Sequence, residues 1–63
     1  MKAFDVIFMD RASRDFKVIT IAAPSLKKAR EWGKARERDE DVWFRFVEKH
    51  IAGSNYGVTE AMK

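Results

Sequence analysis

The residues of this 63-residue chain that could do chemistry gather around Trp43, in the most aromatic stretch of the sequence. An indole ring flanked by cations can stack on the bases of a nucleic acid while the cations contact phosphates. Arg45 and Lys49 occupy alternate positions after Trp43, so a strand would place all three on one face. The candidate nucleic-acid contacts are Arg11, Arg14, Lys17, Trp43, Arg45 and Lys49.

Catalytic and metal chemistry have little support in the sequence. There is one histidine, His50, and the acidic run 39–41 is typical of a solvated loop. The chain has no cysteine, which excludes disulfides and thiolate metal sites. It contains no glycine-rich phosphate loop or nucleophile motif, and so short a chain can hardly enclose a substrate pocket. We therefore expect a protein that is not an enzyme, with no catalytic residue, metal ligand or cofactor.

The charge balance permits nucleic-acid binding without demanding it. Thirteen lysines and arginines are interspersed with ten acidic residues, which gives a net charge of +3. No apolar run approaches the roughly 18 residues that a membrane span needs, and the N-terminus has no cleavage-site pattern. These features predict a cytoplasmic protein that does not enter membranes.

The elements that must position Trp43 follow from the periodicity of the chain. Alternation over 3–10, and a content of β-branched and aromatic residues over 15–22 and 42–49, predict three strands. Residues 11–14 have the length of a hairpin loop of four or five residues. Pro24 and Ser25 then begin a helix that ends near Arg38, with Ser25 as its N-cap. Gly33 in that helix would allow a close approach to the sheet or to an aromatic ring.

The resulting order β-β-α-β predicts an α+β domain. The right-handed crossover rule gives a three-stranded antiparallel sheet in the order 2-1-3, with the helix on one face. We expect one domain over 1–51 and a flexible tail over 52–63. The pattern resembles half of a ferredoxin-like domain, an architecture that many unrelated functions share. The residues expected beneath the helix are Phe4, Phe8, Phe16, Val18, Phe44 and Phe46.

The opposite face of this sheet carries the functional expectation, because it is more apolar than a solvated face usually is. A homodimer packed through this face would also compensate for the small core of so short a chain. A different protein partner, nucleic acid bound around Trp43, and coverage by the tail are the alternatives. We therefore expect a small interaction or accessory protein. The predicted interaction face is Ile7, Met9, Ile19, Ile21, Trp43, Arg45 and Val47.

Overall fold

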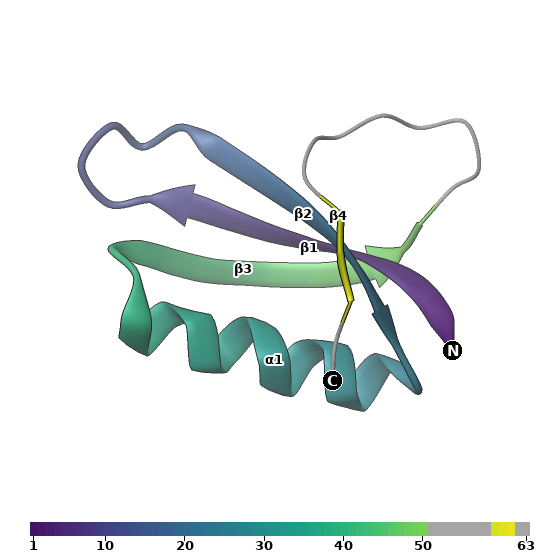
Figure 1. Cartoon of the computed structure of the whole chain (residues 1–63). Coiled ribbons are helices and arrows are strands. Elements are labelled where there is room, and N and C mark those ends of the chain that lie inside the picture. The colour runs from purple at the N-terminus through teal and green to yellow at the C-terminus, as the bar shows by residue number, and fades with distance from the viewer. Residues whose placement is uncertain (51–58, 62–63) are drawn as a thin grey trace.

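One helix packs against one face of a four-stranded sheet (Figure 1). The computed structural model describes residues 1–50 and 59–61. The elements are β1 (Lys2–Asp10), β2 (Phe16–Ala23), α1 (Leu26–Asp39), β3 (Val42–Lys49) and β4 (Thr59–Ala61). The strand order is β3-β1-β2-β4, and β1 pairs antiparallel with both β2 and β3. The predicted α+β class and the order β2-β1-β3 are therefore confirmed.

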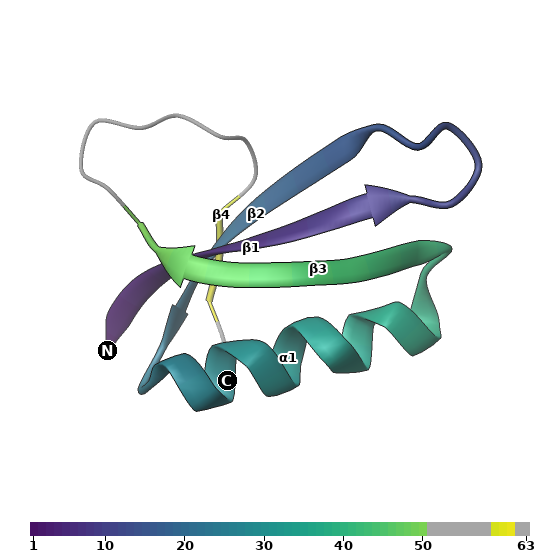
Figure 2. The same cartoon turned by 180° about the vertical axis from the view of Figure 1, so that it is seen from behind.

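The helix begins and ends where the local chemistry predicts. The Ser25 side chain accepts a hydrogen bond from the Lys28 N–H at 3.2 Å, which caps the first turn. At the other end the N–H of Glu40 donates to the Arg36 carbonyl oxygen at 3.0 Å. Between these caps α1 runs along the sheet and packs most extensively against β3, as the view from behind shows (Figure 2).

Gly33 brings the helix unusually close to the sheet. A Cβ atom at this position would lie 2.6 Å from the Phe44 ring and 2.9 Å from a methyl group of Val6. Real Cβ atoms do not approach other atoms so closely, so only glycine fits without movement of these neighbours. The close approach expected of Gly33 is confirmed, and the aromatic ring concerned is that of Phe44.

The hairpin between β1 and β2 decides which side chains of β2 enter the core. The Asp10 N–H donates to the Asp15 carbonyl oxygen at 2.9 Å, so the loop is the four residues 11–14. This register pairs Val6 with Ile19 and Phe4 with Ile21. Because neighbouring residues of a strand point to opposite faces, β2 has the reverse of the predicted orientation.

Ile19 and Ile21 are consequently core residues, and their prediction as an interaction face is wrong. They are 2% and 1% exposed beneath α1, whereas Phe16 faces away from the helix and is 65% exposed. Both sides of β2 are apolar in sequence, so alternation alone could not choose between them. A loop one residue longer would have produced the predicted orientation.

A β-bulge in β3 makes a second change of face. Phe8 pairs with Phe44 but Ile7 pairs with Phe46, which leaves Arg45 as the additional residue of β3. Before the bulge, Val42 and Phe44 face the helix as predicted. After it, Val47 packs against the core and Phe46 faces away, the opposite of the prediction for both residues.

The fourth strand was not predicted. The backbone of Thr59–Ala61 pairs in parallel with β2, from Thr20↔Thr59 to Ala22↔Ala61. The sequence analysis placed these three residues in a flexible tail over 52–63. The remainder of that tail lies outside the described residues, and so does the end of the domain predicted at residue 51.

We predict that Gly33→Ala destabilises the fold, although alanine is the better helix former by about 1 kcal/mol. The new methyl group must displace the Phe44 ring and Val6, and such overpacking typically costs about 1–3 kcal/mol. Urea unfolding followed by circular dichroism measures the change. The control is Ala35→Gly, at an exposed helix position, which should cost only the propensity difference. A stabilised Gly33→Ala variant would contradict this packing.

We predict that the hairpin loop loosens in acid. The Asp10 side chain accepts hydrogen bonds from the Ser13 and Ala12 N–H groups, both at 2.9 Å, and these bonds lower the pKa of Asp10. A lowered pKa means that this stabilisation is complete above the usual value of 3.8 and is lost as the pH falls through the lower folded-state value. In an NMR pH titration, the chemical shift of the Ser13 amide should change over the same pH range as that of the Asp10 carboxyl carbon. A measured pKa of Asp10 at or above the usual value of 3.8 would contradict this prediction.

Candidate functional site

The face of the sheet opposite α1 is the candidate functional site, because its described side chains form two distinct halves. The strand register assigns residues to this face in rows that cross β2, β1 and β3. We call it the open face. Its residues are Asp5, Ile7, Met9, Phe16, Val18, Thr20, Trp43, Phe46 and Glu48.

The half of the open face nearest the hairpin loop is apolar. Met9 pairs with Phe16 on one side and with Trp43 on the other, and the next row joins Val18, Ile7 and Phe46. Phe16 is 65% exposed, Phe46 50% and Trp43 36%. We call Met9, Phe16, Val18, Trp43 and Phe46 the aromatic patch. Three exposed aromatic side chains on one sheet face are more than an ordinary solvated sheet presents.

The charges beside the aromatic patch are balanced. The Arg11 guanidinium lies 5.9 Å from the centre of the Trp43 ring, and its Nε atom is 4.0 Å from the Asp41 carboxylate. Arg45 is exposed at the bulge, and Glu48 lies on the open face of the same strand. The segments that border the patch therefore offer cations and carboxylates together, unlike a uniformly basic nucleic-acid surface.

The structure brings together only some of the predicted nucleic-acid contacts. Arg11 and Trp43 are in contact, Arg14 is exposed in the hairpin loop with φ 64°, and Arg45 is exposed. Lys17 pairs with Phe8, and Lys49 pairs with Phe4, so both project on the helix side.

Lys17 reaches the Glu40 carboxylate at 3.6 Å, at the C-terminus of α1. Of the cations that the sequence predicted around Trp43, the two lysines therefore do not lie on the open face.

The predicted interaction face is corrected in the same way. Met9 and Trp43 lie on the open face at its surface, while Ile7 lies there but is buried. Ile19, Ile21 and Val47 belong to the core side. Sequence reasoning missed Phe16 and Phe46, the two most exposed aromatic side chains of the open face, because it misplaced the faces of β2 and of the second half of β3.

The other half of the open face is polar and largely buried. Asp5 is 1% exposed, and one of its carboxylate oxygens, Oδ1, accepts a hydrogen bond from the Thr20 hydroxyl at 2.7 Å. The same oxygen lies 2.8 Å from Nδ1 of His50. A carboxylate oxygen accepts, so His50 donates through Nδ1. These bonds offset the cost of burying the Asp5 carboxylate.

An aspartate that orients a histidine is also the arrangement of a general base, which needs a nucleophile and a pocket beside it. Within residues 1–50 and 59–61 there is no such pocket and no cluster of metal-binding side chains. The Thr20 hydroxyl donates to Asp5 instead of facing His50. The three residues form a hydrogen-bond network that joins β1, β2 and the end of β3. Its sequence signal was Asp5, the one charged residue within the apolar run 3–9.

We predict that Thr20→Val lowers the free energy of unfolding by about 1–3 kcal/mol, because it removes a hydrogen bond from a buried carboxylate. Thr20→Ser keeps the hydroxyl and serves as the matched control. Urea unfolding at neutral pH measures both variants. Equal stability of Thr20→Val and the unsubstituted protein would show that the Asp5 carboxylate does not depend on this bond.

In the described part of the chain no helix is long and apolar enough to cross a membrane.

The likeness of this chain to known proteins gives no further guide. Comparison with protein-family models, with curated proteins and with solved structures finds no match, so function must be argued from the geometry.

Proposed function

We propose that this protein is a small binding module that self-associates through the aromatic patch of its open face. The observation that carries the proposal is the exposure of Phe16, Trp43 and Phe46 on one side of the sheet, opposite the helix. Burying large apolar side chains drives association, at about 1.5–3 kcal/mol for each one fully buried. A chain of this size buries only about 60% of its unfolded surface as a monomer, so a second copy adds the core that it lacks.

The charges around the patch favour a second copy over a different partner. A two-fold interface places the same surface on both sides, so it must be complementary to itself. Arg45 and Glu48 on one strand, with Arg11 and Asp41 beside Trp43, supply both signs of charge within one surface. Rotation of a copy about a two-fold axis can then bring opposite charges together around an apolar centre.

A second candidate function is stacking of single-stranded nucleic acid on the same patch. The three exposed aromatic rings favour it, because bases stack on such rings for about 1–3 kcal/mol each. The balanced charges and the position of Lys17 and Lys49 on the helix side count against it. We therefore place it second.

We predict that the protein sediments as a dimer and that Phe46→Lys converts it to a monomer. A lysine in the centre of an apolar interface would be buried without a partner. Leu26→Lys is the matched control, because Leu26 is an exposed apolar residue at the start of α1, away from the open face. Sedimentation at low and high salt gives the mass, and a dimer held by apolar contacts should persist at high salt.

Two outcomes would overturn self-association through the open face. One is a monomeric mass for the unsubstituted protein at hundreds of micromolar, and the other is a dimer that persists in Phe46→Lys. Titration with an oligothymidine tests the second candidate function, because stacking of bases on the aromatic patch would quench tryptophan fluorescence. Loss of that quenching in Phe46→Ala would assign the patch to nucleic acid.

A further inference from the structure

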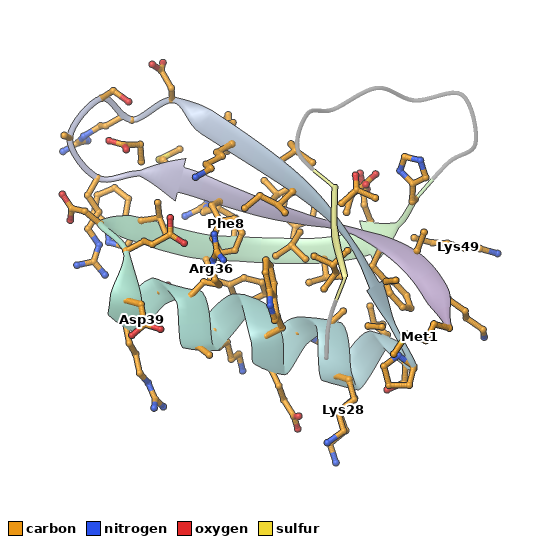
Figure 3. All side chains as sticks on the ribbon, viewed as in Figure 1. Met1, Phe8, Lys28, Arg36, Asp39 and Lys49 are labelled. Atoms are coloured by element: carbon orange, nitrogen blue, oxygen red, sulfur yellow. The ribbon has the colours of Figure 1, made fainter. Side chains whose placement is uncertain are left out.

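The solvent side of α1 carries a continuous line of cations. Lys27, Arg30, Lys34 and Arg38 follow one another at spacings of three, four and four residues, and all four are exposed. This spacing keeps them on one side of a helix, and at about 1.5 Å per residue the line is roughly 16 Å long. We call these four residues the basic stripe. Figure 3 shows that two cations of the helix point in different directions: Lys28 points away from the sheet, whereas Arg36 points toward it.

Three of the four carboxylates in and directly after the helix have partners outside the basic stripe, and the fourth, Asp39, is exposed beside Arg38 without an ion pair to it. Glu31 pairs with Lys28 at 3.5 Å, outside the stripe. Glu37 accepts a hydrogen bond from the Phe44 N–H of β3 at 2.6 Å. Glu40, at the helix C-cap, contacts Arg36 at 2.5 Å.

Among residues 1–50 and 59–61, none of the four stripe cations forms an ion pair. Four positive charges are thus left facing solvent together.

This distribution works against the stability of the isolated helix. The first turn of α1 has no acidic residue and carries Lys27 and Lys28, where the positive end of the helix dipole disfavours cations. Arg30, Lys34 and Arg38 are like charges four residues apart, an arrangement that destabilises an isolated helix. Arg38, in the last turn, is favourable for the helix dipole. Helix formation therefore does not explain Lys27, Arg30 and Lys34, whereas a polyanion lying along the helix would attract each of them.

We propose that the basic stripe binds the phosphate backbone of double-stranded nucleic acid, without sequence preference. Phosphate contacts need only cations and a surface that follows the backbone, and release of counterions supplies the free energy. Aromatic residues for base stacking do not line the stripe. Trp32, the aromatic residue of α1, lies between the Phe8 ring and the Arg36 guanidinium, at 6.2 Å and 4.9 Å.

The burial of the apolar side of α1 distinguishes this partner from a membrane. A helix that binds a membrane surface inserts apolar side chains between the lipids. Here Ala29 and Gly33 are buried against the sheet and Trp32 is half-buried. Leu26, at the first position of α1, is the one large apolar residue of the helix that is exposed, so the helix has no continuous apolar side to insert. The stripe also lies on the opposite side of the molecule from the open face. Duplex binding is therefore compatible with self-association and goes beyond it, since a dimer through the open faces would carry two stripes on its outer surfaces.

The test measures binding of a fluorescent 20-base-pair DNA duplex of arbitrary sequence by anisotropy, from 50 to 200 mM salt. Four phosphate contacts predict a slope of log K against log salt of about −3.6. The double variant Lys34→Gln/Arg38→Gln should reduce the slope by about 1.8 and weaken binding at every salt concentration. Glutamine is as good a helix former as lysine and arginine, so circular dichroism should show the same helix content.

The matched control removes two exposed cations that lie outside the basic stripe, as Lys2→Gln/Arg14→Asn. Asparagine tolerates the left-handed backbone of Arg14, at φ 64°. This variant should keep the slope of the unsubstituted protein. A loss of slope in the control but not in Lys34→Gln/Arg38→Gln would place nucleic acid away from the basic stripe and overturn the proposal.

Three further results would overturn it: no duplex binding at 50 mM salt, tighter binding to an oligothymidine than to the duplex, or tighter binding to phosphatidylserine vesicles. Sedimentation of the same samples keeps the two proposals separate. A monomer that binds the duplex contradicts only self-association, and a dimer that does not bind it contradicts only the role of the basic stripe.

Discussion

The β-bulge in β3 is the constraint on which the aromatic patch and the core beneath the helix both depend. One additional residue, Arg45, lets Phe44 face the helix while Phe46, two positions later, faces away from it. The helix holds the strand at this point, because Glu37 accepts the Phe44 N–H and Gly33 receives the Phe44 ring. In a regular strand Phe46 would lie on the helix side and Val47 on the open face.

The two halves of the open face show why its apolar half is the functional candidate. At the polar end Asp5 is buried, and its carboxylate accepts hydrogen bonds from Thr20 and His50. That end has its own internal partners and gains little from a ligand. At the apolar end Phe16 and Phe46 are at least half exposed, and contact with another surface would remove them from water. The apolar surface that binding could remove from water therefore lies near the hairpin loop.

The two proposed surfaces use different physical forces and lie on opposite sides of the sheet. The aromatic patch offers apolar area surrounded by both signs of charge, which suits a second copy of the chain. The basic stripe offers one sign of charge on a helix whose apolar side is already occupied, which suits a polyanion. A small domain can separate the two functions in this way because a single helix and a single sheet leave two outer surfaces.

The sequence by itself determined the first three strands, the helix and their order, since these depend on local chemistry. Alternation gave the strands, Ser25 gave the start of the helix, and the crossover rule gave the order β2-β1-β3. It also gave the positions of Trp43 on the open face and of Gly33 beneath an aromatic ring. Only the tertiary structure decided which side chains of β2 and of the second half of β3 enter the core. Ile19 and Phe16 are both apolar, so the choice between their faces depended on a loop of four rather than five residues. The choice between Phe46 and Val47 depended on one bulge, and the pairing of Thr59–Ala61 with β2 joins residues far apart in the chain. Each is a matter of register between strands, and a shift of one residue exchanges the faces of a strand without changing its composition.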